Sequence, residues 1–359
     1  MKPLDLSKFR KNVTKAMGIV DGYHDPQTWV DTGNYAINKL ISGSFFKGVP
    51  LGKVTVLAGR SGSGKSLLAC GNIVKNCQKE GILPIILDSE FAIDEAWLHR
   101  AGVDTSPDKL MRFPVTLVDD CASMVMEFMS LYTAEYADVP PEDRQKVMFI
   151  IDSVGMLSTP TEVSQFSEGQ MKGDMGRKAK QLKAFVTQCL KMFGPHNVGL
   201  IATNHVYQSQ NQFDPEDVVS GGSGFIFASS IILLMDKLKL KKDENGNKVT
   251  EVRGIRAKLK CIKSRYARTF AELEIPIPMD TGIMPYAGLF DMLESRSIVS
   301  KSGNRYKFIC KDGTEILKYR KDYLPEDFDR IMMETDDSDL DDEEGIGSEL
   351  EELAEVIPE

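Results

Sequence analysis

The sequence predicts an α/β fold built around a mostly parallel central sheet, and two observations lead to this expectation. Between residues 53 and 204, short apolar segments of strand length alternate with longer amphipathic segments, the pattern of parallel strands joined by helices. Beyond residue 225 the alternation stops, and two long segments flank Asp243-Glu244-Asn245-Gly246-Asn247, a run that favours a hairpin. We therefore expect a parallel sheet that is covered by helices on both faces and extended by antiparallel strands.

Apolar spacing predicts the individual elements. Candidate strands are residues 53–58, 82–88, 110–114, 147–152 and 198–204, and then, beyond the change of pattern, 231–240, 249–263 and 270–278. Candidate helices are residues 65–79, 121–136 and 176–193. The last helix carries an apolar stripe made of Leu182, Phe185, Val186, Cys189 and Leu190.

Composition divides the chain into four expected parts. Residues 1–30 form an N-terminal helical segment, whose apolar stripe either contacts a neighbouring subunit or packs on its own domain. Residues 31–286 form the α/β core. Residues 287–333 form a small α+β unit, with a helix near 288–293 and two strands around 311–314. Residues 334–359 form an acidic tail whose composition is typical of disorder.

The net charge of −9 is unevenly distributed. Residues 334–359 hold thirteen Asp or Glu and no Lys or Arg, so the rest of the chain carries a net charge of +4. A mildly basic body with an acidic tail suits an anionic partner whose access the tail moderates. The alternative is a solvated tail that only aids solubility.

Other features favour a cytoplasmic protein that has no membrane partner. The six cysteines are scattered without a C-x-x-C pair, which argues for reduced thiols and against a zinc site or a disulfide framework. No secretory signal is recognisable at the N-terminus, and the most apolar run, residues 225–235, is too short to span a bilayer.

The glycine-rich run after the first strand is the most specific chemical signal. It has the pattern G-x-x-x-x-G-K-S and consists of Gly59, Arg60, Ser61, Gly62, Ser63, Gly64, Lys65 and Ser66. Between a strand and a helix this is a phosphate-binding P-loop, whose backbone N–H groups and helix N-terminus hold phosphate oxygens. We expect Lys65 to reach the β- and γ-phosphates of ATP and Ser66 to bind Mg²⁺.

Three polar residues follow other strands at the same predicted edge. Asp152 ends strand 147–152 and is expected to bind Mg²⁺ directly or through water. Glu90 lies just past strand 82–88, where a carboxylate can orient or deprotonate the attacking water; Asp88 is the rival candidate. His205 follows strand 198–204 and is placed to report the loss of the γ-phosphate.

Two long segments leave the same edge without a predicted helix or strand. They are residues 156–175 and 206–222, and the second is followed by glycines and serines at 220–224. Long loops inside compact domains are usually functional. We expect these loops to form a binding surface that is coupled to the nucleotide.

Together the motifs resemble those of RecA-like recombinases. Residues 59–66, 87–91, 149–153, 203–205 and 220–224 occur in that family's order. Three short motifs are most similar to those of the recombinases of T4-type bacteriophages: Asp-Ser-Glu-Phe at 88–91, Asn-His-x-Tyr at 204–207 and Lys-Ser-Arg at 263–265. The similarity extends from about residue 30 to residue 300, and an acidic C-terminal tail also fits this group.

The resemblance implies a RecA-like ATPase core and a helical filament on single-stranded DNA, with ATP bound between adjacent subunits. Such a filament pairs with homologous double-stranded DNA and exchanges strands. By position, Glu90 matches the residue that activates water, Asp94 and Trp97 match residues that flank the adenine, and His205 stands where bacterial members have a glutamine. Lys263 and Arg265 match the basic pair that a neighbouring subunit inserts toward the phosphates.

The resemblance also assigns the two long loops to DNA. Backbone groups near Gly221 and Gly222, and the cations Arg177 and Lys178, are expected to meet DNA phosphates. Phe213 is expected to stack on bases or wedge between them. A single-strand-binding protein and a recombination mediator are the further partners implied, in a host cell's cytoplasm if a bacteriophage encodes the chain.

Two alternatives stay open at this point. A hexameric helicase with a RecA-type core would require a sizeable helical domain before the P-loop, and fewer than sixty residues precede Gly59. A nucleotide-sensing, DNA-binding scaffold would not need Glu90 or the basic pair for hydrolysis.

Overall fold

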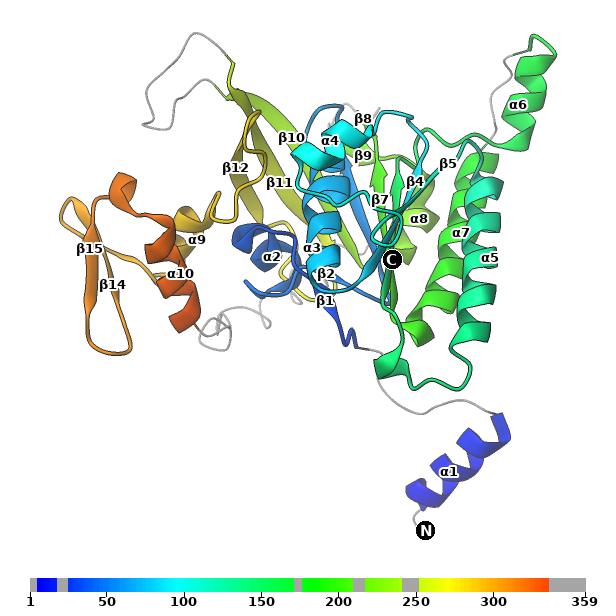
Figure 1. Ribbon diagram of the computed structural model, residues 1–359, viewed down its shortest axis with the longest axis horizontal. Coiled ribbons are helices and arrows are strands. Elements are labelled where there is room, and N and C mark those ends of the chain that lie inside the picture. Colours follow the sequence, from blue (N-terminus) through cyan, green and yellow to red (C-terminus); the bar gives the residue numbers. More distant parts are fainter. Residues whose placement is uncertain (1–4, 18–24, 171–175, 209–216, 241–251, 336–359) are drawn as a thin grey trace, which may run out of the picture.

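The computed structural model describes residues 5–17, 25–170, 176–208, 217–240 and 252–335 (Figure 1). Its centre is an eight-stranded sheet with the order β12-β11-β10-β3-β7-β6-β4-β5. The six strands from β10 to β5 run parallel, and β11 and β12 add to the β10 edge in antiparallel pairing. The predicted fold class, a mostly parallel sheet extended by antiparallel strands, is confirmed.

The strand bounds agree closely with the apolar runs that predicted them. In chain order they are β3 (Val54–Gly59), β4 (Leu83–Asp88), β5 (Met111–Pro114), β6 (Val147–Asp152), β7 (Val198–Asn204), β10 (Ile231–Leu240), β11 (Gly254–Ser264) and β12 (Glu272–Pro278). β6, β7 and β10 begin and end at the predicted residues. β6 and β7 are inner strands and are buried on both faces, so each is a continuous apolar run and does not alternate between apolar and polar residues.

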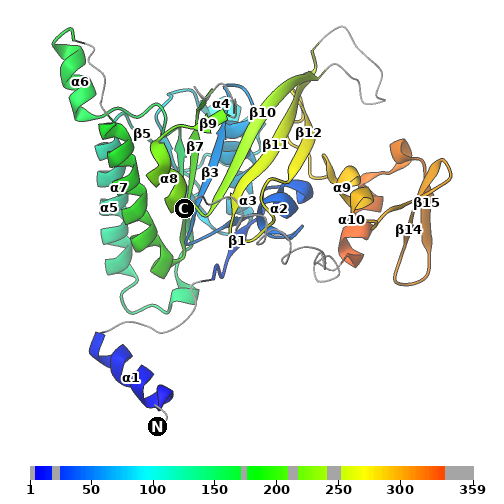
Figure 2. The ribbon, with the colours of Figure 1, turned by 180° about the vertical axis from the view of Figure 1, so that it is seen from behind.

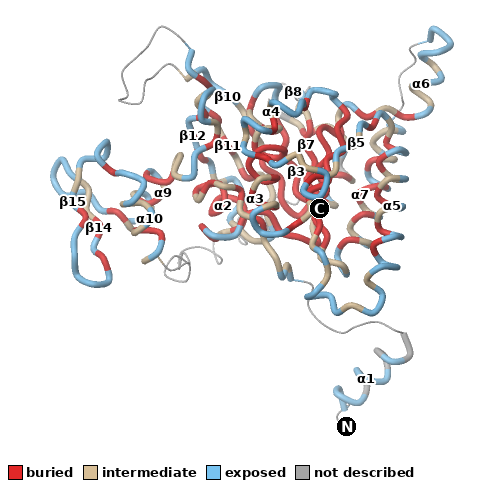
Figure 3. The backbone as a smooth tube through the Cα atoms, in the orientation of Figure 1, coloured by how far each residue is buried: buried red, intermediate tan, exposed pale blue. Residues whose placement is uncertain are grey.

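Helices cover both faces of the sheet, as Figures 1 and 2 show. On one face lie α5 (Val118–Glu135), α7 (Arg177–Phe193) and α8 (Gly222–Ala228). The other face is covered by α2 (Tyr35–Ser42), the π-helix η1 (Leu67–Ile73), α3 (Val74–Lys79) and α4 (Glu95–Arg100). Strand residues alternate between the two cores: Phe149 packs toward α5 and α7, and Ile150 packs toward η1 and α3. Figure 3 shows this buried centre in red.

Several helices lie where the sequence did not indicate them. α6 (Pro160–Ser167) occupies the segment 156–175 that was expected to be a loop, and it opens at a capping box between Thr159 and Glu162. α4 and α8 are short, and α10 (Pro325–Glu334) was also missed. The predicted helix 65–79 is one continuous helical stretch, but its first part has π geometry.

Smaller elements complete the chain. α1 (Leu6–Met17) stands at the N-terminus, β1 (Trp29–Val30) pairs with β2 (Val49–Pro50), and β8 (Val206–Gln208) pairs with β9 (Asp217–Val219). The C-terminal part contains α9 (Leu289–Ser295), α10, and a three-stranded sheet made of β13 (Ser300–Ser302), β14 (Arg305–Ile309) and β15 (Glu315–Lys318). Short 3₁₀ turns lie at Pro141–Asp143, Gly194–His196 and Arg320–Asp322.

The C-terminal elements enclose a third apolar core, which includes Phe290, Phe308 and Tyr323. All six cysteines are free and buried. Among the described helices, none is both long enough and apolar enough to cross a bilayer. Residues 336–359, which hold nearly all of the acidic tail, lie outside the described part of the chain.

Asn34 ties the start of the core to the segment that leads into α9. Its side-chain oxygen accepts a hydrogen bond from the Ile37 N–H and caps α2, while its Nδ2 donates to the carbonyls of Met284 (2.7 Å) and Ala287 (2.9 Å). The side chain is 1% exposed. One buried amide therefore fixes a helix start and a segment about 250 residues further along the chain.

We predict that Asn34→Ala destabilises the protein by about 2–3 kcal/mol, because it removes a helix cap and leaves two carbonyl groups without their donor. Denaturant unfolding of the full chain measures this loss. Gln27→Ala, which removes an exposed hydrogen bond to the Asp25 carbonyl, is the matched control and should change the unfolding free energy by less than about 0.5 kcal/mol. Equal losses in the two variants would contradict the role of Asn34.

Candidate active site

The P-loop joins β3 to η1 at the carboxyl edge of the sheet. Gly62 (φ +71°) and Gly64 (φ +97°) adopt left-handed conformations, which side chains with a Cβ rarely do. A Cβ on Gly59 would lie 2.0 Å from the carbonyl oxygen of Met235 on the neighbouring strand. The glycines are thus required by the loop's path as well as by the approach of a phosphate.

Lys65 turns back over this loop. Its Nζ donates to the carbonyls of Gly59 and Arg60, both at 2.9 Å. Burial lowers the pKa of Lys65, while the negative charges of Asp152 and Glu90 act to raise it. The ammonium group is therefore held against the loop by two carbonyls, where a phosphate would bring it a further negative partner.

A cavity of about 850 Å³ opens beside the P-loop. That volume is within the usual range for a small-molecule site. The P-loop and η1 form one wall, and α4 contributes Trp97 and Arg100. Trp97 was predicted to flank a base and does line the cavity. Asp94 is not among the lining residues; its carboxylate caps α4 by accepting the Trp97 N–H at 2.6 Å.

The remaining wall consists of residues 277–283, which sequence analysis did not single out. This segment comprises the last two residues of β12 and the five that follow, and Asn72 of η1 holds it by donating to the Ile283 carbonyl at 3.2 Å. No local motif marks it, because it reaches the cavity only through the antiparallel pairing of β10, β11 and β12. Lys237 of β10 was missed as well; it donates to the Ser61 carbonyl. Lys75, on the predicted helix, lines the cavity but belongs to no motif.

Asp152 lies at the carboxyl end of β6 and is 3% exposed. It accepts a hydrogen bond from Thr203 Oγ1, and Cys70 Sγ lies 3.9 Å from its other oxygen. Burial raises the pKa of Asp152, hydrogen bonds from Thr203 and Ser66 oppose the rise, and the charges of Glu90 and Asp88 add to it. A buried carboxylate whose ionised form is costly is a good partner for a cation.

The donor set tests whether Mg²⁺ fits here. Ser66 and Asp152 bring a hydroxyl and a carboxylate to the same place, since Ser66 lies close enough to lower the pKa of Asp152. Mg²⁺ prefers such hard oxygen donors and typically takes few ligands from the protein, with phosphates and water completing the octahedron. The predicted pair therefore fits the ion.

Glu90 and His205 meet at the same edge, with Ser153 between them. Glu90 Oε1 accepts a hydrogen bond from Ser153 Oγ at 2.7 Å and lies 3.4 Å from His205 Nε2. Both the Glu90 and the His205 side chains are about one third exposed, so water reaches them. Ser153 was not predicted, although it directly follows Asp152.

Asp88, the rival of Glu90, has a different environment. Its side chain is fully buried and pairs with Arg112 Nη2 at 2.6 Å. It also accepts the backbone N–H groups of Glu90 (3.2 Å) and Phe91 (2.9 Å). All these contacts turn Asp88 inward, so the geometry favours Glu90 as the carboxylate that faces a water molecule.

The β8–β9 hairpin begins at Val206, the residue after His205. Asn204 Nδ2 donates to the Ser220 carbonyl at 2.7 Å, and the Ser220 N–H donates to the His205 carbonyl at 3.0 Å. Gly221 (φ +96°) and Gly222 (φ +78°) then turn the chain into α8. The base of the hairpin is thus hydrogen-bonded to the Asn204 side chain and to the His205 backbone. Phe213, the predicted base-stacking residue, lies outside the described residues.

Arg177 and Lys178 start α7 and contact the other long segment. Arg177 Nη1 donates to Thr161 Oγ1 at 3.3 Å, and Lys178 Nζ donates to the Gly155 carbonyl at 2.6 Å. These contacts place both cations at the ends of the segment predicted to bind DNA. Their predicted DNA contacts stay predictions.

Lys263 and Arg265 lie at the opposite edge of the sheet. Ser264 pairs with Ile231, and Ile231 pairs with Thr55 at the start of β3, whereas the P-loop leaves β3 at Gly59. The separation along β3 alone is about 13 Å, from four residues at the rise of an extended strand. The basic pair therefore lies away from the P-loop of its own chain.

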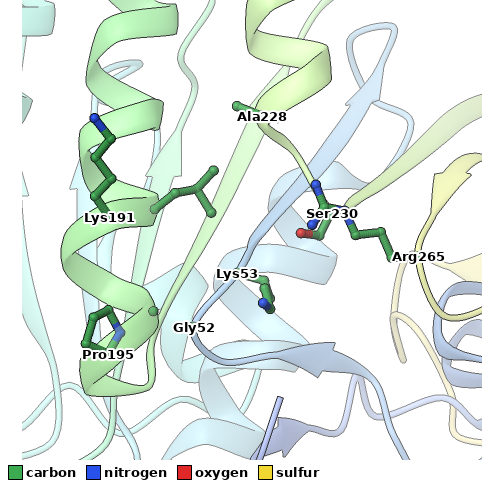
Figure 4. Close-up of a pocket in the computed structure, with 9 residues that line it drawn as sticks. Gly52, Lys53, Lys191, Pro195, Ala228, Ser230 and Arg265 are labelled. Atoms are coloured by element: carbon green, nitrogen blue, oxygen red, sulfur yellow. The ribbon is translucent and has the colours of Figure 1, made fainter. Parts of the chain in front are cut away.

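Other cations gather near this pair. Arg265 lines a pocket of about 310 Å³ together with Lys53 and Lys191 (Figure 4). Burial and then the charge of Arg265 lower the pKa of both Lys53 and Lys263. Lys263 Nζ also donates to the carbonyls of Ile226 (2.9 Å) and Phe227 (3.0 Å). Clustered like charges of this kind suit an anion that comes from outside the chain.

Asp152→Asn should stabilise the nucleotide-free protein at pH 7. The raised pKa of Asp152 means that its ionised form weakens the folded state, a cost that grows as pH rises through the folded-state pKa and that asparagine removes. The same variant should lose most of the stabilisation by Mg²⁺-ATP, which for the parent chain is about 2.7 kcal/mol at one hundred times Kd. Thermal unfolding with and without nucleotide measures both effects.

Asp138→Asn at an exposed position is the control and should change neither quantity. A lower melting temperature for nucleotide-free Asp152→Asn would contradict the electrostatic account. An undiminished shift with Mg²⁺-ATP would contradict the metal site.

Comparison with known proteins agrees with this architecture. The sequence profile of the RecA N-terminal domain matches residues 7–284. The chain is 27% identical over 296 residues to the "Recombination and repair protein" of Enterobacteria phage T4, a match that covers 81% of this chain and 70% of that protein. It is 27% identical over 266 residues to "Protein RecA" of Treponema denticola, covering 73% of this chain and 58% of that protein. It is also 26% identical over 310 residues to "Protein RecA" of Rhodococcus jostii, covering 85% and 81% respectively. The predicted resemblance is confirmed: the chain belongs to the RecA family.

Proposed function

We propose that this chain is an ATP-dependent recombinase that polymerises on single-stranded DNA and catalyses homologous pairing and strand exchange, with DNA-dependent hydrolysis of ATP. The observation that carries the proposal is the separation of two complementary features on one sheet. The P-loop with its carboxylates lies at one edge, and Lys263 and Arg265 lie at the other. Copies that stack head to tail bring the two edges together, and such an arrangement forms a filament if it does not close.

The residues at the carboxyl edge are suited to hold Mg²⁺-ATP. The P-loop amides and Lys65 would bind the phosphates, Ser66 and Asp152 would bind the metal, and Trp97 with the wall at 277–283 would enclose the nucleoside. When bound, the metal neutralises charge on the phosphates.

Glu90 is proposed as the residue that orients or deprotonates the attacking water. It is accessible, it is fixed by Ser153, and it adjoins Lys65 closely enough to affect its pKa. Lys263 and Arg265 of the next copy would then stabilise the negative charge that develops on the phosphates. Hydrolysis would consequently depend on assembly.

His205 is proposed as the link between nucleotide and DNA. It contacts Glu90 on one side, and its backbone anchors the base of the β8–β9 hairpin on the other. The hairpin with Phe213, Gly221 and Gly222, and the segment flanked by Arg177 and Lys178, would contact DNA without regard to sequence. The acidic tail, a single-strand-binding protein and a recombination mediator would regulate access to DNA, in the cytoplasm.

Two substitutions test the site. Lys65→Ala should abolish nucleotide-dependent assembly, because it removes a phosphate contact.

Glu90→Gln should keep ATP binding but lower DNA-stimulated turnover by about 10²–10⁴-fold, the usual contribution of a general base. Phosphate release and equilibrium ATP binding are the measurements, and full turnover in either variant would refute its assignment.

Electron microscopy with single-stranded DNA and a slowly hydrolysed ATP analogue tests the assembly. Continuous helical filaments that need both ligands are expected. Closed rings would favour a hexameric helicase, and hydrolysis that does not respond to DNA would favour a nucleotide-sensing scaffold.

A further inference from the structure

Asp88 connects an arginine on the edge strand to the turn that carries Glu90. One carboxylate oxygen accepts from Arg112 Nη2 at 2.6 Å, and the other accepts the N–H groups of Glu90 (3.2 Å) and Phe91 (2.9 Å). Asp88 is 0% exposed, while the Arg112 side chain is 37% exposed and reaches in from β5. A continuous path of hydrogen bonds therefore runs from Arg112 to the backbone of Glu90.

The turn has an unusual backbone that this path holds in place. Phe91 has φ +54°, a left-handed conformation that bulky residues rarely adopt, and its ring is 61% exposed. Because Phe91 is largely exposed, packing against apolar neighbours does not hold this turn in place. The two N–H groups bonded to Asp88 do, and hydrogen bonds to an ionised carboxylate are about twice as strong as those between neutral groups.

The Asp88 carboxylate is buried beside a second acid, so its ion pair matters to the turn. Asp88 and Asp152 are paired neighbours at the ends of β4 and β6. Removing one partner of a buried ion pair is strongly destabilising. Arg112 supplies the compensating charge in direct contact with Asp88.

The other side of Glu90 is fixed independently. Ser153 Oγ donates to the Glu90 carboxylate, and the Ser153 backbone exchanges two hydrogen bonds with Ser89 Oγ (2.6 and 2.8 Å). Glu90 is thus held at its carboxylate by β6 and at its backbone by Asp88. Misplacement of a catalytic group by about 1 Å can cost a hundredfold in rate, so both supports matter.

We propose that Arg112 is a positioning residue for hydrolysis: its ion pair holds the Asp88 carboxylate in place, and Asp88 fixes the turn that aims Glu90 at the water. This inference rests on the proposed role of Glu90 and adds a residue that touches neither nucleotide nor metal. It explains why the turn carries two acids on either side of Ser89: Asp88 is buried, whereas Glu90 is about one third exposed.

Arg112→Gln tests the proposal in the full-length protein. With saturating single-stranded DNA and ATP, kcat should fall about 10-fold to 100-fold while Kd for ATP stays within about twofold, because Arg112 lines no part of the nucleotide cavity. Arg112→Lys keeps the charge and should recover most of the rate. Arg320→Gln is the matched control, since Arg320 pairs with Asp291 at the same 2.6 Å on the C-terminal unit, and it should keep the parent rate.

A second variant guards against simple misfolding. Asp88→Asn combined with Arg112→Gln leaves no buried charge unpaired, and it should fold, bind ATP normally and still turn over slowly, because a neutral amide holds the turn less firmly. Parent turnover in Arg112→Gln or in this double variant would overturn the proposal, as would weakened ATP binding at unchanged kcat.

Glu90→Gln separates this proposal from the proposed function. If Glu90→Gln keeps full turnover, Glu90 is not the water-activating residue and the role of Arg112 falls with it. If Glu90→Gln loses turnover and Arg112→Gln keeps it, only the role of Arg112 is refuted.

Discussion

The parallel pairing of β10, β3, β7, β6 and β4 is the constraint on which the rest of the structure depends. Parallel strands in register end at one common edge, and here that edge collects the P-loop, Asp88, Asp152 and Asn204. The pairing also determines what the site lacks. Because β11 returns antiparallel along β10, its last residues lie at the far edge, and the cations found there are distant from the P-loop of their own chain.

The second constraint on the site is that two carboxylates are buried at this edge of the sheet. Asp88 and Asp152 lie side by side with almost no exposure, and each depends on a different compensation. Arg112 compensates Asp88 within the chain, which turns that carboxylate into a support for the Glu90 turn. Asp152 accepts a hydrogen bond from Thr203 and has the Cys70 thiol 3.9 Å away, and burial raises its pKa, so a cation would be a favourable partner. Asp88 thereby has a structural role, whereas Asp152 remains available to bind a metal.

The sequence was sufficient for features that are encoded locally. Continuous apolar runs predicted β6, β7 and β10 to the residue, and the G-x-x-x-x-G-K-S motif located the P-loop. Features that depend on distant pairing were missed: the wall at 277–283, Lys237 beside Ser61, and Arg112 beneath the Glu90 turn. α6 could have been predicted, because Thr159 and Glu162 form a capping box, but its place between two motifs suggested a loop. The roles proposed for Lys263 and Arg265 in a neighbouring copy came only from the family resemblance.

The central claim is that two chains build each active site, and mixing two inactive variants tests it most directly. Glu90→Gln keeps the basic edge, while a chain with both Lys263→Ala and Arg265→Ala keeps the P-loop edge. The account predicts that each is inactive alone, and that an equal mixture on single-stranded DNA regains roughly a quarter of the parent ATPase activity, the fraction of head-to-tail contacts that combine both intact edges. A mixture that remains as inactive as its components, or a basic-pair variant that is active alone, would contradict the claim.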